Sequence, residues 1–282
     1  MKVISNASEL ALFLSKYRKK KSLGFVPTMG AIHLGHLSLL KRSLAQNDLS
    51  ICSIFINPTQ FNNSDDLKNY PKKLDQDLTL LKQAGCNIVF TPSDYDIYPK
   101  GFVAKSYDLY GLENMLEGRH RPGHFEGVAQ VVSQLFRIVQ PHRAYFGEKD
   151  FQQLAIIRAL AAQNFRSIDI ISCPTMREKD GLAMSSRNVL LNKKHRAAAA
   201  RIYQRLLHVK KQCNTTTIAE LKRWVAEAFI SDDDFSLEYF EIVDAISLKK
   251  SVIWADFTTH IACIAVRANT IRLIDNILLE IN

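Results

Sequence analysis

The sequence predicts an α/β protein: a Rossmann-like parallel sheet with helices on both faces, followed by a smaller α+β domain. Over the first 175 residues, short apolar and β-branched runs alternate with amphipathic helical patterns, which is typical of βαβ units. After Met176, two helical patterns precede three strand-like runs that have few helices between them. We therefore expect two domains, 1–175 and 176–282.

The first domain is expected to alternate strands with helices. Its strands are predicted at 23–27, 49–56, 87–90, 143–147 and 168–173, where apolar residues form short runs. Its helices are predicted at 36–47, within 67–85, at 124–139 and from about 150 to 163. The second of these begins near Pro71 and is stopped by Gly85. Alternation of this kind predicts right-handed crossovers and parallel strands.

The second domain is expected to be partly antiparallel. A basic amphipathic helix is predicted at 192–212, and a second helix at 216–230 has Thr215 or Thr216 as its cap. Strands are predicted at 236–245, 260–268 and 270–279.

The composition limits the classes of protein to which this chain can belong. Hydrophobic residues make up 47% and charged residues 23% of the 282 residues, which is enough apolar material for a folded core. The net charge of +9 suits an anionic partner, but the basic residues are spread along the chain, so nucleic acid is not favoured. Five isolated cysteines without CxxC spacing argue against a disulfide framework or a zinc site. No stretch approaches the roughly 20 apolar residues of a membrane helix, and no secretory signal is visible, so we expect a cytoplasmic protein.

Four polar segments follow predicted strands. They are PTMGAIHLGH (27–36), INPTQF (56–61), FGEKD (146–150) and CPTMRE (173–178). Ligands bind beyond the carboxyl ends of parallel strands, so these segments are expected to converge on one edge of the sheet.

The segment PTMGAIHLGH has three interpretations. Gly30 and Gly35 let backbone N–H groups approach an anion, and a helix that begins near His36 points its positive end at that anion. His33 and His36 would then donate to phosphate oxygens. Alternatively, the histidines only cap a structural turn, or they bind a metal. Metal is the least favoured interpretation because nothing nearby supplies a third ligand.

The remaining polar segments each have a functional and a structural interpretation. Asn57 and Gln60 offer amides suited to hydroxyls and carboxylates, or they belong to an Asn-Pro turn. The segment GRHRPGHFEGV (118–128) is a basic loop over an anionic substrate or a solvated loop. Lys149 suits phosphate, whereas Asp150 orients that lysine, reaches magnesium through water or caps a helix. The run Ser185–Arg187 suits a triphosphate, or it is a polar linker.

Two resemblances sharpen these alternatives. The HxGH pattern of His33 and His36 resembles the signature of the nucleotidyltransferase superfamily. The ordered set PTMGAIHLGH, INPTQF, EGRHRPGHFEGV, FGEKDFQQL and DGLAMSSRN, with RLIDN at 272–276, resembles the pantoate–β-alanine ligase (pantothenate synthetase) family over nearly the whole chain.

The resemblance implies an AMP-forming ligase. Members of the family join pantoate to β-alanine with ATP and magnesium, through a pantoyl-adenylate intermediate and with release of pyrophosphate. A homodimer is implied, in which each chain has a Rossmann-like domain for ATP and pantoate and a smaller C-terminal lid. Nucleic acid and membranes are not expected partners.

The resemblance also implies residue roles. His36, His33 and Lys149 are the implied catalytic residues, with His36 as the proton donor; Gln60 and Gln153 would bind pantoate, and Gln60 also β-alanine. The implied ATP-binding residues are Met29, Gly30, Ala31, Ile32, His33, Leu34, Gly35, His36, Gly147, Glu148, Lys149, Asp150, Met176, Met184, Ser185, Ser186 and Arg187. No protein metal ligand is expected. The chain departs from the family pattern at Leu34, where many members carry Glu.

Two other functions compete with the ligase. A different nucleotidyltransferase would share HxGH and transfer a nucleotidyl group to a phosphate-bearing acceptor, without a need for the Gln60 and Gln153 pair. A non-catalytic RNA-binding relative of a synthetase would bind RNA in a salt-sensitive way, and the intact phosphate motifs disfavour it.

Overall fold

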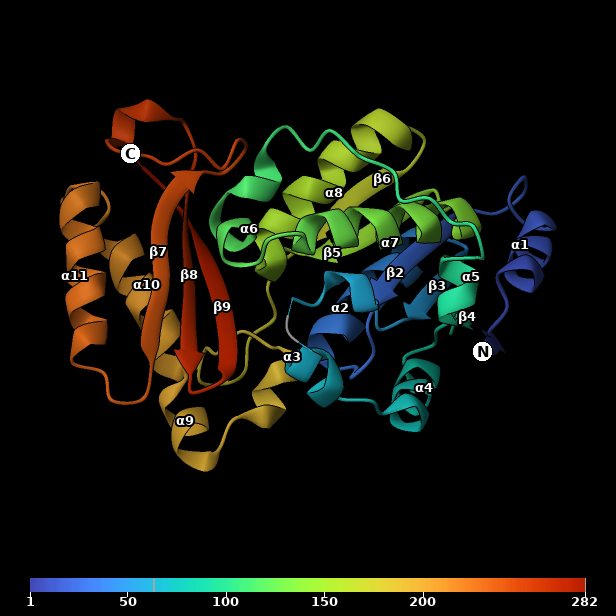
Figure 1. Cartoon of the computed structure of the whole chain (residues 1–282), viewed down its shortest axis with the longest axis horizontal. Coiled ribbons are helices and arrows are strands. Elements are labelled where there is room, and N and C mark those ends of the chain that lie inside the picture. Colours follow the sequence, from blue (N-terminus) through green and yellow to red (C-terminus); the bar gives the residue numbers. More distant parts are fainter. Residues whose placement is uncertain (63, 282) are drawn as a thin grey trace. The chain divides into compact units, whose positions relative to one another are not determined.

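The computed structural model describes residues 1–62 and 64–281, which form two compact units (Figure 1). The first unit comprises Met1–Glu113, Gly118–Glu148 and Gln153–Pro174. The second comprises Asn114–Glu117, Lys149–Gln152 and Thr175–Asn282. Two short segments thus group with the second unit although their neighbours along the chain group with the first.

A six-stranded parallel sheet forms the centre of the first unit. Its strands are β1 (Lys2–Ile4), β2 (Leu23–Thr28), β3 (Leu49–Ile54), β4 (Ile88–Phe90), β5 (Arg143–Gly147) and β6 (Asp169–Cys173). Their order is β1-β4-β3-β2-β5-β6, and every pairing is parallel, as predicted. The chain leaves β2 towards β3 on one side and later returns to β5 on the other. The carboxyl ends of β2 and β5 therefore mark a topological switch point, where ligands of such sheets bind.

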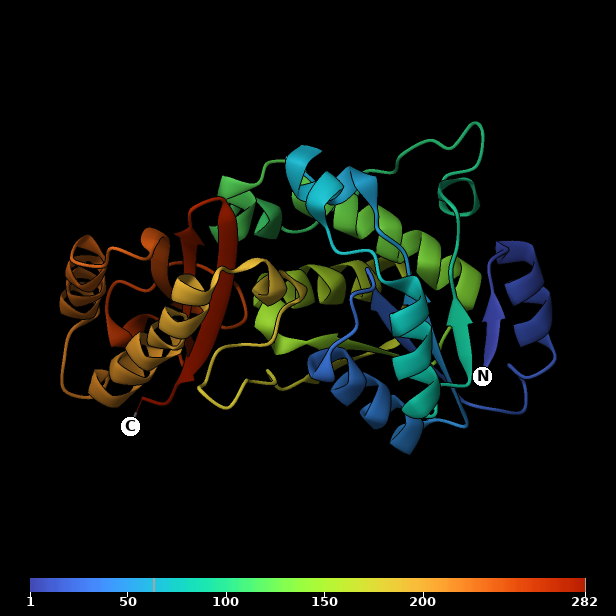
Figure 2. The ribbon, with the colours of Figure 1, turned by 90° about the horizontal axis from the view of Figure 1, so that it is seen from below.

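Helices cover both faces of this sheet. The main ones are α1 (Ala7–Ser15), α2 (Leu34–Gln46), α4 (Leu74–Gln83), α7 (His124–Val139) and α8 (Phe151–Asn164). Alternate residues of β2 point to opposite faces: Val26 joins a cluster with Leu40 of α2 and Leu81 of α4, whereas Phe25 meets Phe136 of α7 edge to face. Figure 2 shows α2 and α7 on opposite sides of the strands.

Shorter helical segments complete the first unit. They are η1 (Pro58–Gln60), α3 (Ser64–Asn69), α5 (Asp94–Ile97), η2 (Leu112–Asn114), α6 (Leu116–His120) and η3 (Glu148–Asp150), of which α6, η2 and η3 extend partly into the second. The helix expected to begin near Pro71 begins at Leu74, and the helix expected from His36 begins at Leu34. β1 was missed because three residues are too few to show a period.

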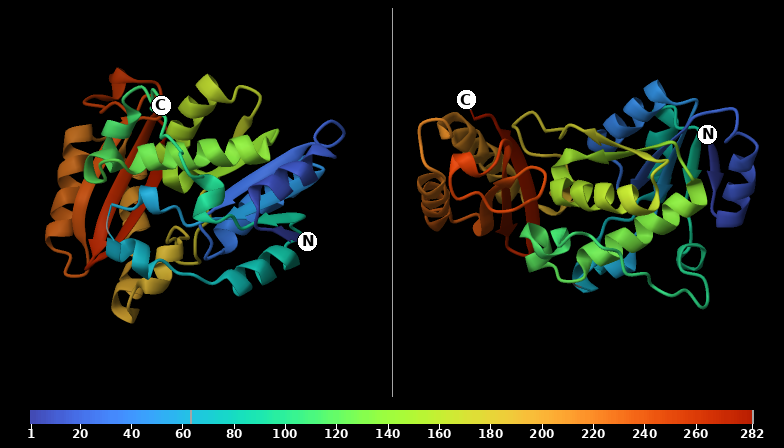
Figure 3. Two further views of the ribbon diagram at one scale, coloured as in Figure 1. Left: turned by 45° about the vertical axis from the view of Figure 1, so that its right-hand side comes forward. Right: turned by 90° about the horizontal axis from the view of Figure 1, so that it is seen from above.

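The second unit is built on a three-stranded sheet of order β7-β8-β9. Its strands are β7 (Ser236–Asp244), β8 (His260–Ala268) and β9 (Ile271–Leu279), and both pairings are antiparallel. Leu206 of α10 (Ala200–Gln212) and Val225 of α11 (Ile218–Ile230) join Leu273 of β9 in one buried cluster. Figure 3 shows these two helices beside one face of the sheet.

Two predictions for the second unit were wrong in detail. The single helix expected at 192–212 is divided into α9 (Lys193–Ala198) and α10, because the N–H of Ala199 bonds to Arg196 and that of Ile202 to Ala199, three residues back instead of four. The cap of α11 is Thr217, not Thr215 or Thr216. Its side chain and that of Glu220 cap each other's backbone N–H groups, so the Thr-x-x-Glu signature was the stronger signal.

Candidate active site

The turn after β2 is held in a left-handed conformation. The Thr28 hydroxyl donates to the carbonyl of Ser53 at 2.7 Å and accepts from the N–H of Gly30 at 3.1 Å. Gly30 and Ala31 have φ values of 81° and 49°. A Cβ on Gly30 would lie 2.9 Å from a carboxylate oxygen of Asp77, so this position needs glycine for both conformation and space.

Asp77 shapes the turn from the neighbouring helix α4. Its two carboxylate oxygens accept the N–H groups of Ala31 at 2.8 Å and Ile32 at 2.7 Å, and the residue is 2% exposed. Burial raises the pKa of this carboxyl, and the two backbone N–H groups oppose that rise. Sequence reasoning missed Asp77. The signal was present, because Asp77 occupies an apolar position in the helical series Leu74, Leu78 and Leu81.

His33 and His36 lie at the positive end of the 13-residue helix α2. His33 is the N-cap, and its Nδ1 accepts the N–H of Gly35 at 3.1 Å. Nδ1 of His36 accepts the N–H of His33 at 3.4 Å, and the two ring centroids are 4.0 Å apart. A neutral imidazole that accepts at Nδ1 carries its proton on Nε2. Both histidines therefore cap this turn, and in a neutral ring the remaining proton lies on Nε2, which leaves Nε2–H as the donor for which the phosphate interpretation calls.

Gln60 has its side chain oriented by two partners. Nδ2 of Asn57 donates to Oε1 of Gln60 at 3.1 Å, and Nε2 of Gln60 approaches the Met29 sulfur at 3.1 Å. Tyr98 donates to Oδ1 of Asn57 at 2.8 Å, which fixes the Asn57 amide. Gln60 is 8% exposed. The structure thus brings together Met29 and Gln60, two predicted site residues from different strand ends.

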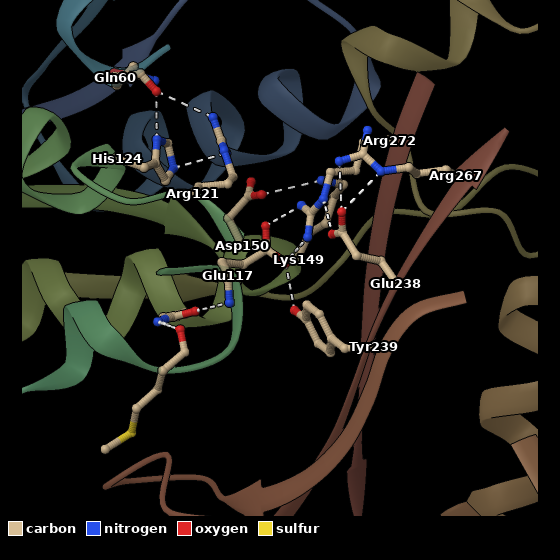
Figure 4. Close-up of polar contacts among 12 residues, drawn as sticks. Gln60, Glu117, Arg121, His124, Lys149, Asp150, Glu238, Tyr239, Arg267 and Arg272 are labelled. Atoms are coloured by element: carbon tan, nitrogen blue, oxygen red, sulfur yellow. Dashed lines mark hydrogen bonds and ion pairs between the residues drawn. The ribbon is translucent and has the colours of Figure 1, made fainter. Parts of the chain in front are cut away.

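The backbone of Gln60 is held by α7 and the residues just before it (Figure 4). Its carbonyl accepts from Nδ1 of His124 at 2.8 Å and from Arg121 at 3.3 Å, and Nε2 of His124 accepts from Arg121 at 3.0 Å. These roles define a neutral His124 ring. The basic segment 118–128 is therefore mixed: Arg119 and His120 are exposed, whereas His124 is buried.

The segment after β5 is divided between the two units. Gly147, Glu148 and Gln153 belong to the first, whereas Lys149 and Asp150 belong to the second, where their side chains form an ion pair of 3.3 Å. Gln153 lies in the first turn of α8. In the second unit, the carbonyl of Lys149 accepts a hydrogen bond from Nδ2 of Asn276 at 2.9 Å, a partner that lies 127 residues away.

The remaining predicted ATP residues assemble within the second unit. Arg177 and Ala183 form an antiparallel bridge, and the N–H of Met184 bonds to the carbonyl of Met176 at 2.9 Å. Met176 and Met184 therefore stand side by side at the base of a short hairpin. Ser185 then caps the 3-10 helix η4 (Ser186–Leu190) by accepting the N–H of Arg187 at 3.3 Å, so this run is an ordered element and not a linker.

Neither a metal-ligand cluster nor a membrane-spanning helix is present among residues 1–62 and 64–281. No group of three or more His, Cys, Asp or Glu side chains there is arranged to hold a metal ion. No helix there combines the length and the apolar character needed to cross a membrane.

The sheet order, with the HxGH turn at its switch point, places the chain in the nucleotidyltransferase superfamily. The family model described as "Pantoate-beta-alanine ligase" matches residues 2–278. The chain belongs to this family.

Relatives with this family's name match the chain over nearly their full lengths. The chain is 47% identical over 279 residues to a pantothenate synthetase of Phocaeicola vulgatus, covering 98% of this chain and 99% of that one. A pantothenate synthetase structure from Thermus thermophilus superposes with a TM-score of 0.93 at 38% identity, covering 99% of this chain and 100% of that one. The pantoate-β-alanine ligase of Francisella tularensis, complexed with beta-gamma ATP and β-alanine, superposes at 0.82 with 36% identity, covering 99% and 97%.

Proposed function

We propose that this protein is a pantothenate synthetase that condenses pantoate with β-alanine and converts ATP to AMP and pyrophosphate. The observation that carries the proposal is the pair of imidazole rings, His33 and His36, at the N-terminus of α2 and at the switch point of the sheet. The family membership and the relatives' names support the same activity.

The chemistry needs no covalent enzyme intermediate. The pantoate carboxylate attacks the α-phosphorus of ATP, forming pantoyl adenylate and releasing pyrophosphate. The β-alanine amine then attacks the activated carbonyl, and AMP leaves as pantothenate forms. Both histidine Nε2–H groups and the dipole of α2 stabilise charge that develops on the phosphates, and His36 is assigned as the hydrogen-bond donor to the pyrophosphate oxygen as that group leaves. Lys149 adds a positive point charge.

Two glutamines are the proposed pantoate ligands. We propose that Gln60 and Gln153 bind pantoate and that Gln60 also contacts β-alanine. The amide of Gln60 suits this role because Asn57 holds its orientation in a buried setting. For ATP, the residues proposed are 29–36, 147–150, 176 and 184–187.

The proposal also covers the metal ion, the two domains, the oligomeric state and the location. Magnesium would neutralise phosphate charge. It would enter bound to ATP, since Mg²⁺ is usually held through phosphates, water and one or two carboxylates. Asp150, which pairs with Lys149, is the carboxylate that would contact it. Residues 1–175 are assigned to ATP and pantoate binding, and 176–282 to a lid that keeps water from the adenylate. A homodimer and a cytoplasmic location complete the assignment.

A pyrophosphate exchange assay tests the proposal. Purified protein with ATP, magnesium and labelled pyrophosphate is expected to label ATP only when pantoate is present. Addition of β-alanine is then expected to release AMP. Absence of pantoate-dependent exchange would refute the ligase, and a dinucleotide-like product in place of AMP would indicate a different nucleotidyltransferase.

A further inference from the structure

Strand β9 contacts the two short segments that join the second unit. Arg272 and Asn276, in the run RLIDN, are four residues apart and therefore point to the same face of the sheet, about 13 Å from one another. Leu273 and Leu279 point to the opposite face, into the core with α10 and α11. The face with Arg272 and Asn276 holds Asn114–Glu117 and Lys149–Gln152.

Asn276 fixes one end of Lys149–Gln152. Its Nδ2 donates to the carbonyl of Lys149 at 2.9 Å, and the residue is 9% exposed. Its own backbone is fixed in turn: the N–H of Asn276 bonds to Asp275 at 2.8 Å, and its carbonyl accepts from Arg177 at 3.3 Å. Arg177 also donates to both carboxylate oxygens of Asp275, at 2.6 and 3.0 Å, and its guanidinium lies over the ring of Tyr203. This donor is therefore rigidly placed.

Gln152 fixes the other end of the same segment. Its Oε1 accepts the N–H of Glu117 at 2.9 Å, and its Nε2 donates to the carbonyl of Met115 at 2.8 Å. The Glu117 carboxylate accepts two N–H groups of Arg272, one of them at 2.8 Å, and the hydroxyl of Tyr239 at 2.6 Å (Figure 4). Arg272 is thus connected to Gln152 through Glu117, whose carboxylate bonds to Arg272 and whose backbone N–H bonds to Gln152.

The charges around Arg272 compensate one another. Arg272 also donates to Glu238 at 2.5 Å, and Glu238 accepts from Arg267 at 2.7 Å, so two guanidinium groups face two carboxylates. Burial lowers the pKa of the Arg272 guanidinium, but Glu117 and Glu238 outweigh this and raise it overall. Arg272, Glu117 and Glu238 are largely buried and only Arg267 is exposed, so a shift within the cluster would leave a charge uncompensated and one geometry is favoured.

We propose that Asn276, together with Arg272 acting through Glu117 and Gln152, positions Lys149 for its work on the ATP phosphates. This inference rests on the proposed function. The electrostatic effect of an ammonium on developing phosphate charge depends on distance, and displacements of about 1 Å cost up to a hundredfold in rate. The position of the Lys149 backbone is set by the hydrogen bond to its carbonyl, and its side chain, 18% exposed, extends from there to pair with Asp150 at 3.3 Å. Asn276 and Arg272 are positioning residues and touch no substrate.

A double-mutant cycle tests this role. Asn276→Ala removes the bond to Lys149, and we expect kcat for pantoate-dependent pyrophosphate exchange to fall about tenfold to a hundredfold, with KM for pantoate unchanged. In a Lys149→Ala background the same substitution should cost less than about twofold, because no ammonium remains to be positioned. High enzyme concentration keeps slow variants measurable. Asn214→Ala is the matched control. It removes a hydrogen bond from an asparagine side chain to a backbone carbonyl, that of Glu280, in the same unit.

The outcomes separate the alternatives. A large loss confined to the background with Lys149 supports the inference. The inference is overturned if kcat of Asn276→Ala stays within about twofold of that of the unmodified protein. It is also overturned if the substitution lowers kcat equally with and without Lys149, since an equal loss indicates a general structural effect. If Asn276→Ala does not fold, Asn276→Asp is judged by the same criteria, because it keeps the size and replaces the donor by an acceptor. An unmodified protein without exchange activity would refute the proposed function itself, and this inference with it.

Discussion

Asp77 shows how a single buried carboxylate shapes the HxGH turn. It receives the N–H groups of Ala31 and Ile32, which the left-handed backbone of the turn directs away from any regular helix or strand. A buried N–H without an acceptor costs about 1–3 kcal/mol, so this one side chain offsets two such costs. His33 and His36 follow immediately, and their placement at the start of α2 depends on the turn.

Asp77→Ala is expected to lower the free energy of unfolding by about 2–4 kcal/mol, because one buried and one partly buried N–H group lose their acceptor. Urea denaturation followed by circular dichroism measures the change. Asp75→Ala serves as the control, since Asp75 is exposed in the same helix. Equal stability of the two variants would contradict the role given to Asp77.

His36→Ala is expected to lower kcat at least a hundredfold while the melting temperature stays within a few degrees of the original. The substitution removes an Nε2–H donor but only a long, 3.4 Å backbone contact. Turnover and thermal unfolding are the measurements, with the exposed His120→Ala as control. Near-normal turnover would remove His36 from the mechanism.

Helix α7 places Gln60 by a close backbone approach. Gly127 lies in this helix, and an added Cβ would lie 2.5 Å from the carbonyl oxygen of Thr59 and 3.0 Å from the Cα of Gln60. The carbonyl of Gly127 also accepts from Asn57 at 3.2 Å. Glycine at this position lets α7 approach η1 closely enough to hold the Asn57–Gln60 pair.

Gly127→Ala is expected to destabilise the protein by about 1–3 kcal/mol, because the methyl group would overlap backbone atoms that cannot rotate away. In an unconstrained helix the same change stabilises by about 1 kcal/mol, so the sign itself is informative. We also expect KM for pantoate to rise. Unfolding experiments and steady-state kinetics provide the test, and a stabilised variant with unchanged KM would count against the close approach.

Most elements were predictable because their signal is local. The helix at His124–Val139 and the strands at Arg143–Gly147 and His260–Ala268 begin and end where the sequence predicted, since the helix carries a clear period and each strand contains a short apolar run. The break at Ala199 was not predictable, because the alanine run around it favours an unbroken helix.

The ion pairs of the second unit make its stability depend on pH. Glu238 illustrates the sign: burial raises its pKa, but Arg272 and Arg267 outweigh this and hold the pKa below the ordinary value of 4.5. A carboxyl of lowered pKa contributes stability that is complete above about 4.5 and is lost as the pH falls through the folded-state value. Glu241, paired with Lys222 and Lys250, behaves in the same way.

We expect the second unit to lose stability below about pH 4.5, and Glu238→Gln to show a weaker pH dependence together with lower stability at neutral pH. The two tryptophans of the chain, Trp224 and Trp254, both lie in this unit, so denaturation followed by tryptophan fluorescence reports on it specifically. A Glu238→Gln variant with the original pH profile would show that this network does not govern the acid response.

The sequence by itself determined the parallel sheet, the turn with His33 and His36, and the family, because periodicity and motifs are contained in neighbouring residues. Only the tertiary structure decided which side chains hold those residues in place. Asp77, Asn276 and the Glu117–Arg272 pair act on partners that lie 45 to 155 residues away. A local pattern can mark such a side chain, as the apolar position of Asp77 does, but it does not identify the partner, since the contact forms only when folding brings distant segments together.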